Sequence, residues 1–137
     1  MANKYYFFLQ ILCYRVIITV SDNLYGENFM NILEAIGTNI QILGHNVDIE
    51  FITAFVSDAN LQGLADGEAN KIYIKTRAED RDIPDSIQVS HLIHEVLEQI
   101  NLKSDGWFFG GEGDEKESKI SMLAEIITQI IYAKFTK

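Results

Sequence analysis

The chain has 137 residues, which is the length of a single domain and enough to bury a hydrophobic core. Its 20 acidic and 11 basic residues give a formal net charge of −9, which would repel a phosphate backbone and argues against nucleic acid as a partner. The lone Cys13 cannot form an internal disulfide, which is typical of a protein of the reducing cytoplasm.

The first segment, from Tyr5 to Val20, is strongly apolar, although Gln10 and Arg15 interrupt it. It is shorter than a membrane-spanning helix and lacks the cleavage site of a signal peptide, so we expect no membrane association. Its aromatic and β-branched residues favour one or two buried strands. Alternatively, Met30 is the natural start, because MNILEAIG is typical of the beginning of a domain. We therefore divide the chain into an apolar N-terminal extension, residues 1–29, and a domain, residues 30–137.

A short helix and a hairpin open this domain. The helix is expected over residues 28–35 and should end at Gly37, a C-cap glycine. Apolar residues then alternate with polar ones on both sides of Gly44, over residues 40–51, which predicts a β-hairpin. His45 falls in the predicted turn, and we interpret it as a turn residue and not as a ligand.

A further strand carries Ile72 and Ile74, just after a turn at Asp66 and Gly67. The charged segment 77–86, which contains Pro84, is predicted to be a loop.

Two helices are expected to close the chain, over residues 86–102 and 115–134, with a glycine-rich and aromatic loop between them at residues 104–118. We predict an α+β fold in which a small, mostly antiparallel sheet packs on the apolar side of the first helix and the second helix completes the domain.

The first helix contains the sequence HLIHEVLE, residues 91–98. At 100° per residue its polar residues share about one-third of the helix circumference, and they are His91, His94, Glu95 and Glu98. Side chains four residues apart lie close enough for His94 and Glu98 to bind one zinc ion. Glu95 projects alongside, where it can act on a water molecule. The alternative is a solvated helix face with two incidental histidines.

A catalytic zinc normally has three protein ligands, so a third must come from another element. The last helix offers Glu125, on the side opposite to an apolar stripe formed by Ile120, Leu123, Ile127, Ile130 and Ile131. An antiparallel arrangement would bring Glu125 to the pair, with Gln129 and Tyr132 as supporting contacts. Simple solvent exposure also explains an acid at position 125. His91 remains open as a substitute ligand, a supporting donor or a surface residue.

From about Asn39 onward the chain resembles the small zincin-like metallopeptidases of phages and mobile elements, relatives of the ImmA/IrrE type. The resemblance follows the order IQILGHNVDIEF, LQGLADGEANKIYIK, VSHLIHEVLEQIN and LAEIITQII. It implies His94, Glu98 and Glu125 as metal ligands and Glu95 as the general base. The chain departs from the family at Glu98, where a second histidine is commoner, and in its longer loop before the last helix.

The leading hypothesis is therefore a cytoplasmic zinc-dependent peptidase of phage or mobile-element origin that cleaves a protein or peptide, a repressor in many relatives. In it, Glu95 would take a proton from an activated water. The first alternative is a non-catalytic phage accessory protein that keeps the zincin fold and binds a protein partner. The second is a structural zinc site without turnover.

Overall fold

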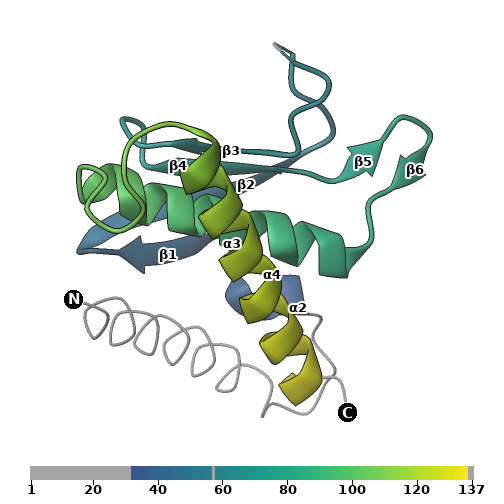
Figure 1. Ribbon diagram of the computed structural model, residues 1–137. Coiled ribbons are helices and arrows are strands. Elements are labelled where there is room, and N and C mark those ends of the chain that lie inside the picture. Colours follow the sequence, from purple (N-terminus) through teal and green to yellow (C-terminus); the bar gives the residue numbers. More distant parts are fainter. Residues whose placement is uncertain (1–31, 57, 136–137) are drawn as a thin grey trace. The chain divides into compact units, whose positions relative to one another are not determined.

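A computed structural model describes residues 32–56 and 58–135, and it divides into two units after Gly37 (Figure 1). The described part of the first unit is the short helix α2, Ile32–Ile36. Gly37 follows it with a φ of 79° and donates its N–H to the Leu33 carbonyl at 3.1 Å, which confirms the predicted C-cap glycine. The predicted extension, residues 1–29, lies outside the described residues.

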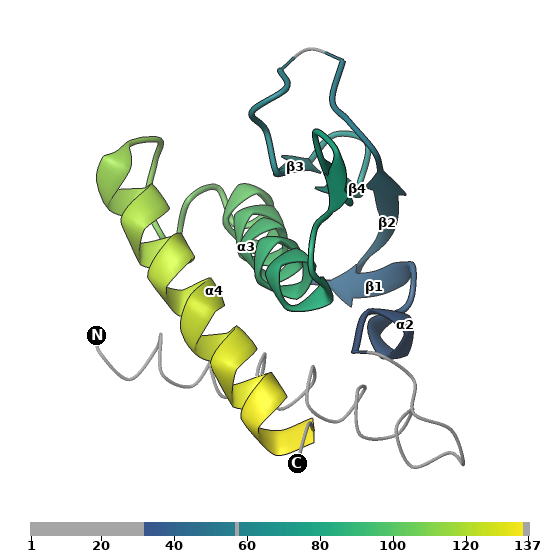
Figure 2. The ribbon, with the colours of Figure 1, turned by 90° about the vertical axis from the view of Figure 1, so that its right-hand side faces the viewer.

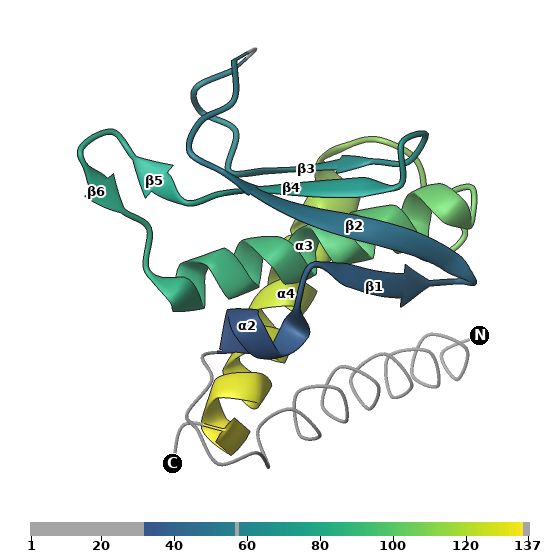
Figure 3. The same ribbon diagram turned by 180° about the vertical axis from the view of Figure 1, so that it is seen from behind.

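The second unit begins with a four-stranded sheet in the order β1-β2-β4-β3 (Figure 3). Its strands are β1 Asn39–Ile42, β2 His45–Ile52, β3 Gly63–Asp66 and β4 Lys71–Lys75. The pairs β1–β2 and β3–β4 are antiparallel, whereas β2 and β4 are parallel. The prediction of a small, mostly antiparallel sheet is confirmed.

The first hairpin turns one residue earlier than predicted. Leu43 and Gly44 both have positive φ angles, 49° and 82°, as the two central residues of a type I′ turn require. His45 is therefore the first residue of β2, where it pairs with Ile42 and is exposed.

The segment predicted as a loop before the first long helix contains a small ribbon. Two short antiparallel strands, β5 Arg77–Ala78 and β6 Arg81–Asp82, form it. Pro84 follows in an extended conformation and occupies the N-cap position of the next helix. That arrangement is expected for proline, which has no N–H to leave unsatisfied in the first turn.

The two predicted long helices are confirmed as α3, Asp85–Lys103, and α4, Asp114–Phe135. Figure 2 shows α3 between the sheet and α4, and Figure 1 shows α4 crossing α3. The apolar side of α3 is buried as predicted, with Val89, Leu92, Ile93, Val96, Leu97 and Ile100. None of the helices in the described part of the chain is long and apolar enough to cross a membrane.

The buried side of α4 differs from the predicted stripe. Ile120, Ala124, Ile127 and Ile131 are buried, whereas Ile130 is 44% exposed. Thr128, which is not part of the predicted stripe, is buried and donates its hydroxyl to the Ala124 carbonyl at 2.7 Å. Because α4 crosses α3, the buried line on its surface deviates from the stripe that spacing alone predicts.

Buried polar side chains of α3 hold the neighbouring segments in place. Gln99 donates from Nε2 to the carbonyls of Asp66 and Lys71, both at 2.9 Å, and so fastens the turn between β3 and β4 to the helix. Asn101 forms two hydrogen bonds with the loop before α4. Its Nδ2 donates to the Gly110 carbonyl and its Oδ1 accepts from the Phe109 N–H, each at 2.9 Å. Amides that satisfy backbone groups in this way also fix the walls of the site described next.

Candidate metal centre

Two helices bring one imidazole and two carboxylates together. His94 and Glu98 lie one turn apart on α3, and Glu117 comes from the first turn of α4. His94 Nε2 is 3.8 Å from Glu98 Oε1 and 3.4 Å from Glu117 Oε2. The ligand atoms of all three residues lie within 4.8 Å of one another, so the group can hold a metal ion.

The spacing within this group fits a common ion. Two ligand atoms that each lie 2.0–2.2 Å from a tetrahedral zinc ion are about 3.3–3.6 Å apart. The two distances from His94 Nε2, 3.8 and 3.4 Å, are close to this value. Imidazole and carboxylate ligands also suit other divalent transition ions, so the donors define a metal class and do not single out zinc.

His94 is in the protonation state that a metal ligand needs. Burial lowers its pKa, an effect that Glu117 opposes and Lys116 reinforces, so the imidazole is predominantly neutral near pH 7. Ser121 Oγ lies 3.4 Å from His94 Nδ1. A proton on Nδ1, directed at Ser121, leaves the Nε2 lone pair facing the two acids.

Glu95 lines the same cleft as His94, Glu98 and Glu117, but its carboxyl is more deeply buried than those of Glu98 and Glu117. Its carboxyl is largely desolvated, and burial, followed by the charges of Glu98 and Glu117, raises its pKa to about 8. Gly63 of β3 lies against it, because a Cβ built at that glycine would be 2.9 Å from Glu95 Cγ. The carboxyl is therefore held next to the metal-binding group by an edge strand of the sheet.

The two acidic members of the group are coupled. Burial, followed by a hydrogen bond that protonated Glu98 donates to Glu117, raises the pKa of Glu98, while the same hydrogen bond lowers the pKa of Glu117. When the pair binds a single proton, that proton therefore resides on Glu98. Lys116 Nζ contacts both residues, at 3.2 Å from Glu98 Oε2 and 3.4 Å from Glu117 Oε1.

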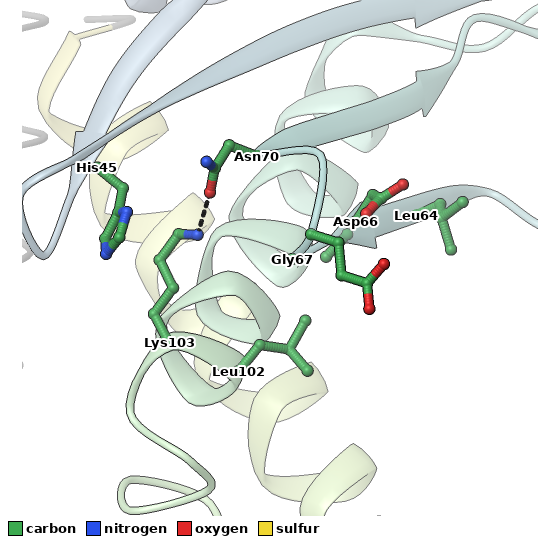
Figure 4. A pocket seen from close by; sticks show the side chains of 9 residues that line it. His45, Leu64, Asp66, Gly67, Asn70, Leu102 and Lys103 are labelled. Atoms are coloured by element: carbon green, nitrogen blue, oxygen red, sulfur yellow. Dashed lines mark hydrogen bonds between the residues drawn. The ribbon is translucent and has the colours of Figure 1, made fainter.

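These residues line a cleft of about 510 Å³ between β3 and α3, near the start of α4. A second hollow, of about 730 Å³, continues past it and shares Leu64, Ala65 and Leu102 with the first. Figure 4 shows the second hollow, where His45, Asn70 and Lys103 lie on one side and Leu102 lies next to Lys103 on the same helix. Leu64 and Leu102 are 41% and 49% exposed, so apolar surface lies where the two hollows meet.

His91, the residue with an open role, also lines the first cleft. Its Nδ1 is buried and has no hydrogen-bond partner among the described residues, and burial, followed by the charge of His94, lowers its pKa. It is not a member of the three-residue group. His91 therefore forms part of the cleft wall, and its lowered pKa keeps the side chain predominantly neutral near pH 7.

Glu125, the predicted third ligand, is exposed and does not belong to the group. The two contacts between the helices run in opposite chain directions, as an antiparallel pair requires, but they place Lys116 beside Glu98 and Ser121 beside His94. Glu125 follows Glu117 by eight residues, about 12 Å along the helix axis. The structure therefore replaces Glu125 with Glu117 as the candidate third ligand.

The same packing of α4 on α3 places the predicted supporting residues, Gln129 and Tyr132, away from the metal-binding group. Gln129 is exposed and lies about 18 Å along the axis from Glu117. Tyr132 is near the other end of α3, where burial, followed by the charge of Asp85, raises its pKa.

The residues missed by the sequence interpretation lie in the segment GDEKES, residues 113–118. The predicted loop, residues 104–118, covers this segment and overlaps the start of the predicted helix, residues 115–134, whereas α4 begins at Asp114 and includes Lys116 and Glu117. The signal that could have found them is the cluster of acids at the helix start, which the helix dipole favours.

Comparison with protein families, curated proteins and solved structures found no match to this chain.

Proposed function

We propose that this protein is a zinc-dependent peptidase whose centre is formed by His94, Glu98, Glu117 and Glu95. The observation that carries the proposal is the meeting of one imidazole and two carboxylates at the spacing of zinc ligands, next to a third carboxyl, that of Glu95, which is not a member of this group. Three protein ligands leave one position open, which is typical of catalytic zinc sites. The sequence resemblance to small zincin-like peptidases supports the same hypothesis.

His94, Glu98 and Glu117 would hold the ion. Zinc supplies Lewis acidity when bound, which polarises a carbonyl and makes a nearby water more acidic. Two carboxylate ligands neutralise more of its charge than a second histidine would, so we expect a modest Lewis acid and slow turnover.

Glu95 is the group available to move a proton. Its raised pKa of about 8 is well above that of an ordinary glutamate and close to neutral pH, the range in which a carboxyl can both accept and return a proton. A divalent cation beside it would favour the ionised form and lower this pKa. Glu95 would then accept a proton from water and deliver it to the amine leaving group.

The walls of the cleft suit an extended peptide. β3 is an edge strand of the described sheet, so one row of its backbone N–H and C=O groups faces away from β4 and can pair with another strand. Leu64 and Leu102 offer an apolar surface next to the metal-binding group. We therefore propose a peptide that lies along β3 and places an apolar side chain between these two leucines.

A matched pair of variants tests the proposal. Protein purified without chelator should contain one zinc per chain and cleave members of a peptide library, identified by mass spectrometry. Glu95→Gln keeps the shape of the side chain but removes the base, so it should retain zinc and lose turnover by about 10²–10⁴-fold. Full zinc content without cleavage of any peptide by the wild type would contradict the peptidase and favour a non-catalytic zinc protein.

A further inference from the structure

Each carboxylate of the metal-binding group uses its two oxygens differently. Glu98 directs Oε1 at His94 Nε2 and Oε2 at Lys116 Nζ, at 3.8 and 3.2 Å. Glu117 does the same with Oε2 at His94 and Oε1 at Lys116, at 3.4 Å each. One ammonium thus bridges the outer oxygens of both acids while their inner oxygens face the imidazole.

The bridge formed by Lys116 offsets the repulsion between Glu98 and Glu117 and fixes the orientation of both side chains. Two carboxylates this close repel each other, and an ammonium with three donors can offset the repulsion by bonding to both. The side chains of Lys116 and Glu98 are each 13% exposed, so water screens their contact only weakly. Fixing one oxygen of a carboxylate fixes the direction of the other, and the bridge therefore sets the orientation of two ligands at once.

We propose that Lys116 is the positioning residue of the metal centre, a lysine clamp that holds Glu98 and Glu117 with one oxygen each toward His94. This inference rests on the proposed function, since it assigns these acids as ligands. The clamp leaves the inner oxygens available, so the lysine and a metal ion bind the same carboxylates without sharing an oxygen.

The same α4 helix provides a control. Lys119 Nζ forms an ion pair with Glu115 at 3.0 Å, but both side chains are more than half exposed and neither belongs to the metal-binding group. Lys119→Met removes one positive charge close to Lys116 in sequence without touching the clamp. It therefore separates the effect of local charge from the effect of positioning.

The experiment measures zinc affinity by competition with a chromophoric chelator for the wild type, K116M, K116Q, K116R and K119M, with thermal melts to verify folding. Loss of a hydrogen-bonding partner of a metal ligand typically weakens binding by about 10–100-fold, which we expect for K116M and K116Q. A guanidinium can also bridge two carboxylates, so K116R should restore affinity to within a few-fold of the wild type. K119M should bind zinc as the wild type does.

Equal or tighter zinc binding by K116M and K116Q would overturn the clamp, because it would make the ammonium a neutral or competing cation. Weak binding by K116R would overturn it as well. Failure of the proposed function is distinguishable from either result: a wild type that binds zinc but cleaves no peptide contradicts the peptidase, while the affinity series still decides the role of Lys116.

Discussion

Gly63 on β3 and Glu95 on α3 lie in direct contact, and the absence of a side chain at Gly63 makes the position of the Glu95 carboxyl possible. A Cβ at residue 63 would be 2.9 Å from Glu95 Cγ and 3.1 Å from Oε1, both shorter than normal contacts. The φ angle of Gly63 is not in the left-handed region, so space and not backbone strain requires the glycine. The edge strand therefore determines where the proposed general base can lie.

Gly63→Ala should displace Glu95 while leaving the metal ligands in place. We expect destabilisation by about 1–3 kcal/mol, the usual cost of overpacking, measured by urea unfolding. Peptide cleavage should fall more than zinc binding. Gly111→Ala is the control, because nothing lies within 4 Å of its added Cβ and its φ is not positive. Wild-type cleavage by the Gly63 variant would show that Glu95 need not occupy its present position.

The choice between Glu117 and Glu125 as a ligand can be tested with three variants. His94→Ala should abolish stoichiometric zinc, because it removes the imidazole whose Nε2 faces both acids. Glu117→Gln should weaken zinc binding by more than about tenfold, since one of three ligands loses its charge. Glu125→Gln should bind zinc normally, because this residue is exposed and outside the group. Chelator competition measures all three, and the reverse order for the two glutamates would restore the original assignment.

The raised pKa of Glu95 predicts a pH dependence of stability when zinc is removed with a chelator. Its folded pKa, about 8, lies above the ordinary value of 4.5, so the folded protein binds this proton more tightly than the unfolded chain. The resulting stabilisation is complete below pH 4.5 and is lost as the pH rises through 8. Its size is on the order of 3–5 kcal/mol.

Glu95→Gln removes this titration and isolates it from the other groups of the cleft. The free energy of unfolding of the wild type, relative to that of the variant, should fall between pH 5 and pH 8. Urea unfolding at several pH values measures the difference. A difference that stays constant over this range would show that Glu95 has an ordinary pKa.

The apolar surface between the two hollows predicts a substrate effect that does not involve the metal. Leu102→Ser should lower kcat/KM by about tenfold for peptides with an apolar residue next to the cleaved bond, because the lost contact is that of one apolar side chain. Its zinc content should not change. Leu43→Ser is the matched control, since Leu43 is 50% exposed at the β1–β2 turn and lines neither hollow. An equal effect of both substitutions on cleavage would argue against a peptide beside Leu102.

Sequence periodicity was sufficient for the local parts of this protein. The apolar and polar sides of α3 follow from helical spacing, and so does the pairing of His94 with Glu98, because residues four apart on a helix are neighbours whatever surrounds them. The β1–β2 hairpin follows from alternation and turn residues, and so does the strand that carries Ile72 and Ile74, whereas its partner β3 was not predicted from alternation. These features depend on interactions within a few residues, which a linear sequence records directly.

The tertiary structure alone decided which residues complete the site. The parallel pairing of β2 with β4 places β3 at the edge and Gly63 against Glu95, and no local pattern encodes a contact between strands so far apart in the chain. Likewise, Glu117 and Glu125 both occur on α4, and only the crossing of α4 over α3 selects Glu117. The reason is geometric: one helical turn advances about 5.4 Å, whereas ligand atoms must meet within a few ångströms, so a small change in helix register exchanges one acid for another.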